Sequence, residues 1–138
     1  MARWFSEVVE RYSSTGHEFP HFSTAEIEEY LSAAGFAEVH VEHLYDPFVL
    51  TADTEDAARE ALASYLLQMY GLQILVRKVG HEEALRRIYT LADECFRYDY
   101  DALGLDPDLG SPQIALREEQ GRVQIELPRV AVVGVATK

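Results

Sequence analysis

The chain has 138 residues, 48% hydrophobic and 26% charged, which is typical of one folded domain. Twelve lysines and arginines against 24 aspartates and glutamates give a formal net charge of −12. Such an acidic balance argues against nucleic acid and against an anionic membrane as direct partners, because both are bound through basic surfaces. We therefore expect neither.

Three features of the sequence predict a cytoplasmic protein. The single cysteine, Cys95, cannot form an internal disulfide, and a lone thiol fits a reducing compartment. The first residues lack the apolar core of a secretory signal. The longest apolar run, residues 130–136, is too short to cross a bilayer as a helix.

The first predicted elements are helical. Hydrophobic spacing predicts a short helix over residues 4–12, followed by a loop that ends at Phe22. Ser23-Thr24-Ala25-Glu26 is a capping-box sequence and predicts a helix over residues 24–34. Gly35 is placed to end this helix in a left-handed conformation.

A strand and two further helices are expected next. Apolar and polar residues alternate over 38–45, which predicts a strand with one side made of Val39, Val41, His43 and Tyr45. Asp53 or Thr54 is expected to cap a long helix that runs to about residue 78 and is kinked or ended at Gly71. A second amphipathic helix is predicted over residues 82–96, with an inward face of Leu85, Ile88, Leu91, Ala92, Cys95 and Phe96.

The last third of the chain is predicted to be mostly extended. Residues 97–112 form an acidic loop, and residues 113–117 and 122–127 are two strands joined by a turn with Gly121 in the left-handed position. Residues 130–136 lack alternation, which predicts a strand buried on both faces. The apolar stretch over 72–76 predicts an exposed hydrophobic surface that another protein element would bury.

One familiar motif is present in an unsuitable context. His17-Glu18-Phe19-Pro20-His21 matches the zinc-protease string H-E-x-x-H, whose chemistry requires a continuous helix. Pro20 inside the string makes that helix unfavourable, so we expect no metal site and interpret the segment as a loop. The glycine spacing excludes a G-x-G-x-x-G loop and a P-loop.

Two stretches of the chain resemble the C-terminal half of a class I S-adenosylmethionine-dependent methyltransferase. Residues 22–39 contain Leu31-Ser32-Ala33-Ala34-Gly35-Phe36-Ala37-Glu38-Val39, similar to the L-x-x-A-G-F-x-x-V junction that leads into the family's sixth strand. Residues 129–138 are similar to its seventh strand, which inserts antiparallel. The resemblance implies an α/β fold (α+β in isolation): a partial Rossmann-like sheet of strands six and seven plus a hairpin, with a helical insertion.

The resemblance also implies a division of the chain and a missing half. Within a single domain, residues 1–52 would be the helix-loop-helix-strand part that resembles the family, residues 53–112 a helical insertion or lid, and residues 113–138 a hairpin followed by the terminal strand. The family's cofactor site lies in an N-terminal half for which this sequence has no counterpart, and the chain begins about where strand five would have ended. It is therefore expected to be a subunit of a split methyltransferase, a self-associating remnant, or a fragment of a longer protein. We favour the first.

On the split-subunit interpretation the chain supplies the acceptor side, and S-adenosylmethionine is bound through a second protein chain; the isolated chain is expected to hold no cofactor. By position in the resembling fold, His17 and His21 are the candidate catalytic residues, and Tyr12, His43 and Tyr45 the candidate binding residues for a small-molecule acceptor. For His43 and Tyr45 the alternative is a packing role under the inserted helices.

Two other function classes remain open on the sequence. The chain is alternatively a non-catalytic module that binds a ligand or a protein, by self-association or with another chain, and then no form of it binds S-adenosylmethionine. A metal protein or hydrolase built on His17, Glu18 and His21 is the third and least favoured class.

Overall fold

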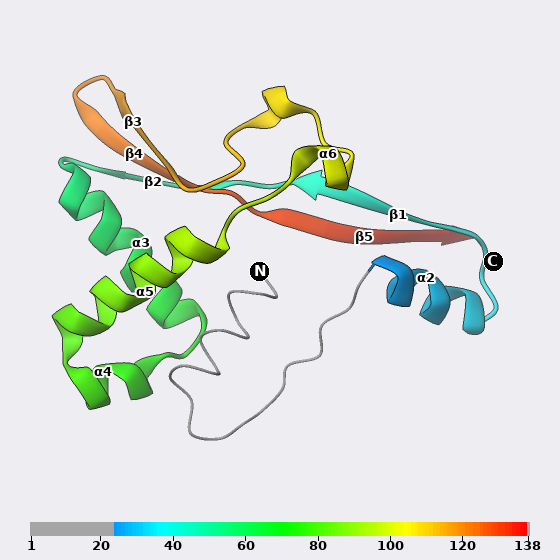
Figure 1. Cartoon of the computed structure of the whole chain (residues 1–138), viewed down its shortest axis with the longest axis horizontal. Helices are drawn as coiled ribbons and strands as arrows, with labels where there is room; N and C mark the ends of the chain where they lie inside the picture. Colours follow the sequence, from blue (N-terminus) through cyan, green and yellow to red (C-terminus); the bar gives the residue numbers. More distant parts are fainter. Residues whose placement is uncertain (1–23, 138) are drawn as a thin grey trace.

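The computed structural model describes residues 24–137, which form a mixed α/β fold with two small antiparallel sheets (Figure 1). In the first sheet, β1 (Ala37–Tyr45) pairs with β5 (Val130–Thr137). In the second, β4 (Arg122–Leu127) lies between β2 (Phe48–Ala52) and β3 (Ala115–Glu119). The helices are α2 (Thr24–Ala33), α3 (Glu55–Met69), α4 (Gln73–Val79), α5 (His81–Cys95) and the short α6 (Tyr100–Leu103), with a 3₁₀ turn, η1 (Pro107–Leu109).

The two sheets are consecutive parts of one long antiparallel ribbon (Figure 1). Tyr45 pairs with Val130 and Phe48 pairs with Leu127, so the register continues unbroken and places Pro47 opposite Pro128. Neither proline can donate a ladder hydrogen bond, and the sheet is interrupted at this point. We call the two residue pairs 46–47 and 128–129 the junction.

On one side of the junction, α3 packs against the sheet β2-β4-β3, α5 packs on α3, and α4 packs on α5. These elements enclose the hydrophobic core, and we call them the core module. Aromatic stacking joins the sheet to α3: the ring centroids of Phe48 and Tyr65 lie 3.9 Å apart, and the angle between the ring planes is 17°. The buried residues come mainly from the helices, with Ile114, Ile125 and Leu127 contributed from the C-terminal third of the chain.

On the other side of the junction, α2, β1 and β5 form what we call the arm, and no side chain in it is buried. Helix α2 ends as predicted: the amide of Gly35 donates to the Ser32 carbonyl (3.0 Å) and that of Phe36 to the Leu31 carbonyl (3.2 Å), a Schellman motif that requires the positive φ of Gly35. The helix then covers the ribbon where Gly134 leaves room for Leu31 and Ile27.

Several sequence predictions are confirmed. Thr54 caps α3 by accepting from the Ala57 amide, and the helix ends before Gly71. All six residues predicted to face inward from α5 are buried. Gln120 and Gly121 have positive φ and form the tight turn between β3 and β4.

Other predictions are wrong. Strand β2 was not predicted, because the sequence analysis placed no strand between residue 45 and the helix cap at Asp53 or Thr54. Strand β5 is not buried on both faces: its residues are exposed or half-buried. The apolar stretch over 72–76 is not an exposed hydrophobic surface. Leu72 and Leu75 belong to the core, and Ile74, which is 43% exposed, is the one apolar side chain of this stretch outside it.

Among residues 24–137, no helix is both long enough and apolar enough to span a bilayer.

Candidate functional site

The residues proposed from the sequence fall into two groups. Tyr12, His17 and His21, with the H-E-x-x-H string, lie outside the described residues. His43 and Tyr45 both lie on β1, half-buried and on the same side as Val39 and Val41, which confirms the predicted alternation.

Tyr45 is the centre of a hydrogen-bonded cluster beside the junction. Its hydroxyl donates to the Glu126 carboxylate and lies 3.2 Å from the Ser111 carbonyl. The Tyr100 hydroxyl donates to the same Ser111 carbonyl at 2.9 Å, and the Ser111 amide donates to Glu126 at 3.2 Å. The rings of Tyr45 and Tyr100 meet edge to face, with centroids 5.9 Å apart. The cluster therefore ties the end of β1 to β4 and to the loop after α6.

This environment fixes the protonation state of Tyr45. Burial, together with the hydrogen bond to the Glu126 carboxylate, raises the pKa of its hydroxyl well above the usual value. A Cβ at Gly110 would lie 2.4 Å from the Tyr45 oxygen, so the loop backbone closes directly over the phenol. Tyr45 is thus a neutral, fully engaged donor, suited to holding structure or orienting a neighbour and unsuited to acting as a base.

His43 has no such cluster around it. It pairs across the ribbon with Val132, which is 43% exposed, and it makes no hydrogen bond or ion pair within residues 24–137. The structure therefore places His43 and Tyr45 on one strand but gives them different surroundings: Tyr45 is locked to β4 and the α6 loop, whereas the ring of His43 is available to a ligand or a covering element.

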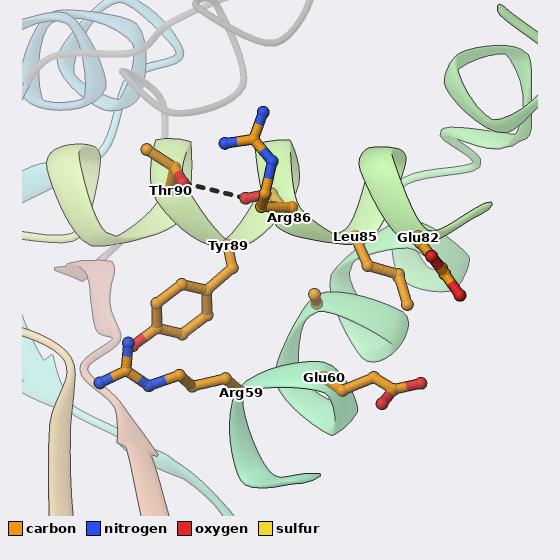
Figure 2. A pocket seen from close by; sticks show the side chains of 8 residues that line it. Arg59, Glu60, Glu82, Leu85, Arg86, Tyr89 and Thr90 are labelled. Atoms are coloured by element: carbon orange, nitrogen blue, oxygen red, sulfur yellow. Dashed lines mark hydrogen bonds between the residues drawn. The ribbon is translucent and has the colours of Figure 1, made fainter. Parts of the chain in front are cut away.

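A separate hollow lies on the core module, between α3 and α5 (Figure 2). It has a volume of about 490 Å³ and is lined by Arg59, Glu60, Ala63, Glu82, Leu85, Arg86, Tyr89 and Thr90. Ala63 and Leu85 are buried and form an apolar floor. We call this hollow the α3/α5 groove. Neither His43 nor Tyr45, the two proposed residues that the structure describes, lines it.

The cationic side chains of the groove are already neutralised. Arg59 forms an ion pair with Glu55, one turn earlier on α3, and its guanidinium lies 5.3 Å from the centre of the Tyr89 ring. Arg86 binds Glu83 through two hydrogen bonds of 2.7 Å. Hydrogen bonds from Arg86 and Arg87 lower the pKa of Glu83 to about 2, so this carboxylate stays charged at any physiological pH.

The acidic segment after α5 is structural within the part of the chain that is described. Asp99 caps α6 by accepting from the Ala102 amide, and Asp106 accepts from the Asp108 amide, so both carboxylates stabilise local turns. No group of three metal-ligating side chains comes together among residues 24–137. The sequence held no signal for either the Tyr45 cluster or the α3/α5 groove, because both join residues far apart in the chain.

Comparison with known proteins adds no assignment to this geometry: no family model, no curated protein and no solved structure matches the chain.

Proposed function

We propose that the chain is the acceptor-side half of an S-adenosylmethionine-dependent methyltransferase, completed by a second chain that carries the cofactor site. The observation that carries the proposal is the arm. A helix with a Schellman end leads into β1, and β1 pairs antiparallel with β5, the arrangement that the resemblance implies for strands six and seven.

The arm is also incomplete by itself, which supports a partner. The face of the ribbon opposite α2 carries Leu44 and Val135, which are 49% and 37% exposed. A two-stranded sheet with no buried side chain is marginal in water, and a covering element would remove this apolar surface from solvent.

The two outer edges of this sheet differ in a way that indicates where the partner binds. Edge strands are commonly protected against further pairing by charged residues or proline. Strand β1 carries charged Glu38 and Glu42 and also His40, whereas β5 has no charged residue and no proline over residues 130–137. We therefore assign the outer edge of β5 as the edge that receives a strand of the cofactor-binding half.

In the assembled enzyme this chain would position the methyl acceptor. S-adenosylmethionine, when bound, supplies the methyl group, and transfer depends mainly on holding the acceptor in line and excluding water. His43, Tyr45 and the N-terminal His17 and His21 are the residues proposed for the acceptor side. A histidine would accept the proton of the methyl acceptor, and Tyr45, whose hydroxyl is committed to Glu126, would hold the end of the strand that carries His43. The buried thiol of Cys95 is in keeping with a cytoplasmic enzyme.

The test is to purify the tagged chain gently from its own cells and to measure S-adenosylmethionine binding by calorimetry on the chain alone and on any complex. We expect the chain alone to bind no cofactor, and a complex with a second protein to bind it at one site. Binding of the cofactor by the isolated chain would contradict the assignment of its site to a partner.

Two matched variants test whether the partner covers the face of the arm opposite α2. Val135→Lys places a charge on the uncovered face, and we expect it to weaken the complex at least about tenfold. Val132→Lys makes the same change at a similarly exposed valine, 43%, on the other face, and we expect a smaller effect. Equal effects of the two variants would contradict docking on the uncovered face.

A non-catalytic interaction module is the second candidate function, and the uncovered face of the arm favours it equally. It differs in its cofactor: a complex that assembles on the arm but binds no S-adenosylmethionine would establish this second function and exclude the first.

A further inference from the structure

The α3/α5 groove has a charge arrangement that neither the resemblance nor the proposed function explains. Figure 2 shows Arg59 and Tyr89 toward one end of the groove and Glu60 and Glu82 toward the other, with Leu85 between them and the Arg86 guanidinium directed away from α3. The groove is therefore polar at both ends and apolar along its floor.

The two arginines that line the groove form ion pairs with residues of the described part of the chain, whereas its two glutamates do not. Arg59 is paired with Glu55 and lies against Tyr89, while Arg86 is paired with Glu83. Glu60 and Glu82, in contrast, form no ion pair or hydrogen bond with any residue of the described part of the chain. Two carboxylates without a counter-charge thus face one end of a hollow whose cations are already neutralised.

We propose that the α3/α5 groove binds a small organic cation, an ammonium group attached to an apolar body. The ammonium would lie between Glu60 and Glu82, and the apolar body would cover Leu85, Ala63 and the free part of the Tyr89 ring. A volume of about 490 Å³ lies within the range of small-molecule sites. All the described residues that line the site belong to the core module, so the inference does not depend on the methyltransferase proposal.

The experiment uses the full chain, isotope-labelled, titrated in low salt with phenethylammonium and followed by amide chemical shifts. Two probes of similar size serve as comparisons: neutral 2-phenylethanol and anionic 3-phenylpropionate. We expect phenethylammonium to shift amides in α3 and α5 and to bind more tightly than either comparison probe, and we expect higher salt to weaken this binding.

A pair of double variants separates the site from the overall acidity of the protein. Glu60→Gln with Glu82→Gln is expected to weaken phenethylammonium binding about tenfold, since each exposed charge pair contributes modestly. Glu28→Gln with Glu29→Gln makes the same change in net charge on exposed positions of α2 and is expected to leave binding unchanged. All four substitutions are at exposed positions, and circular dichroism checks that both variants fold.

Four results would overturn the proposal. They are equal or tighter binding of the neutral probe, equal or tighter binding of the anionic probe, equal weakening by the two double variants, and no shifts in α3 and α5 up to about 10 mM phenethylammonium. That concentration would fill about nine-tenths of a site with a Kd of about 1 mM.

Discussion

The arm and the core module are both built from helices packed on antiparallel strands, yet they bury very different amounts of side chain. The core module contains 17 buried hydrophobic residues, whereas the arm contains none. Hydrophobic burial is the main favourable term in folding, so the stability of the chain resides in the core module. The arm leaves apolar side chains such as Leu44 and Val135 exposed. The core module therefore supplies the stability of the fold, and the arm is the region that we propose binds a partner.

The largest expected effect comes from truncating matched leucines in the two regions. Leu66, 1% exposed in α3, lies in the core, and Leu66→Ala should lower the free energy of unfolding by about 2–5 kcal/mol, because it leaves a cavity. Leu31→Ala in α2 removes a half-buried side chain and should cost about 1 kcal/mol or less. Urea denaturation of both variants measures the contrast. Equal losses would show that the arm is as well packed as the core module.

A second prediction concerns the packing of α2 against β5 at Gly134. A Cβ at Gly134 would lie 2.7 Å from Leu31 Cδ1 and 3.1 Å from Ile27 Cγ2, so Gly134→Val should push the helix outward at a cost of about 1–3 kcal/mol. Faster amide hydrogen exchange confined to α2 would report the displacement. Ala131→Val, on the opposite face of β5, is the control and should leave exchange in α2 unchanged.

The cluster that joins the two regions gives a smaller effect. Tyr45→Phe removes the donor to Glu126 and should destabilise the protein by about 1 kcal/mol, a typical net value for one hydrogen bond. The matched control is Tyr65→Phe: the Tyr65 ring stacks on Phe48 and its hydroxyl forms no hydrogen bond within residues 24–137. Thermal unfolding of the two variants should show a loss only for the first.

The same hydroxyl predicts a dependence on alkaline pH. The pKa of Tyr45 is raised on folding, so above pH about 10 the unfolded chain loses this proton while the folded chain keeps it. The unfolded state then binds fewer protons, and stability falls as pH rises. Burial raises the pKa of Tyr70, Tyr89 and Tyr98 as well, in the same direction. Urea midpoints between about pH 9 and 11 should therefore fall, and less steeply in Tyr45→Phe; an unchanged slope in that variant would contradict the role of the cluster.

The smallest effect is expected at the junction. Arg129 donates to the Asp46 carbonyl at 3.0 Å and to its carboxylate at 2.8 Å, and its guanidinium lies over the Phe48 ring. Arg129→Lys keeps the charge but loses the forked donor, at a cost of about 0.5 kcal/mol. The informative measurement is small-angle scattering, in which a broader distribution of arm positions is expected. An unchanged profile would show that the backbone alone sets the angle.

The local elements could be predicted from the sequence because their signals are local. Capping residues set the start of α3 and the end of α2, and helical spacing identified the buried face of α5, including Cys95 and Phe96. The turn at Gly121 was equally local.

What could not be predicted depended on pairing at long range. Nothing in the sequence indicates that Pro47 and Pro128 face each other, and only the fold shows this pairing within a continuous register. The run of apolar residues in β5 indicated burial, but the neighbours that would bury it are absent from residues 24–137. The partners of Tyr45 could not be foreseen either, since Glu126 is 81 positions away in the chain.

The paired prolines at the junction have a consequence for the lifetime of the protein. Because neither contributes a ladder hydrogen bond, fraying of the arm can stop at the junction, and the arm and core module can behave as separate cooperative units. A protease that acts on open segments would then cut the arm first and leave the core module intact. A partner seated on β5 would suppress this opening by mass action. In the cell, the abundance of the intact chain would thus follow the supply of its partner.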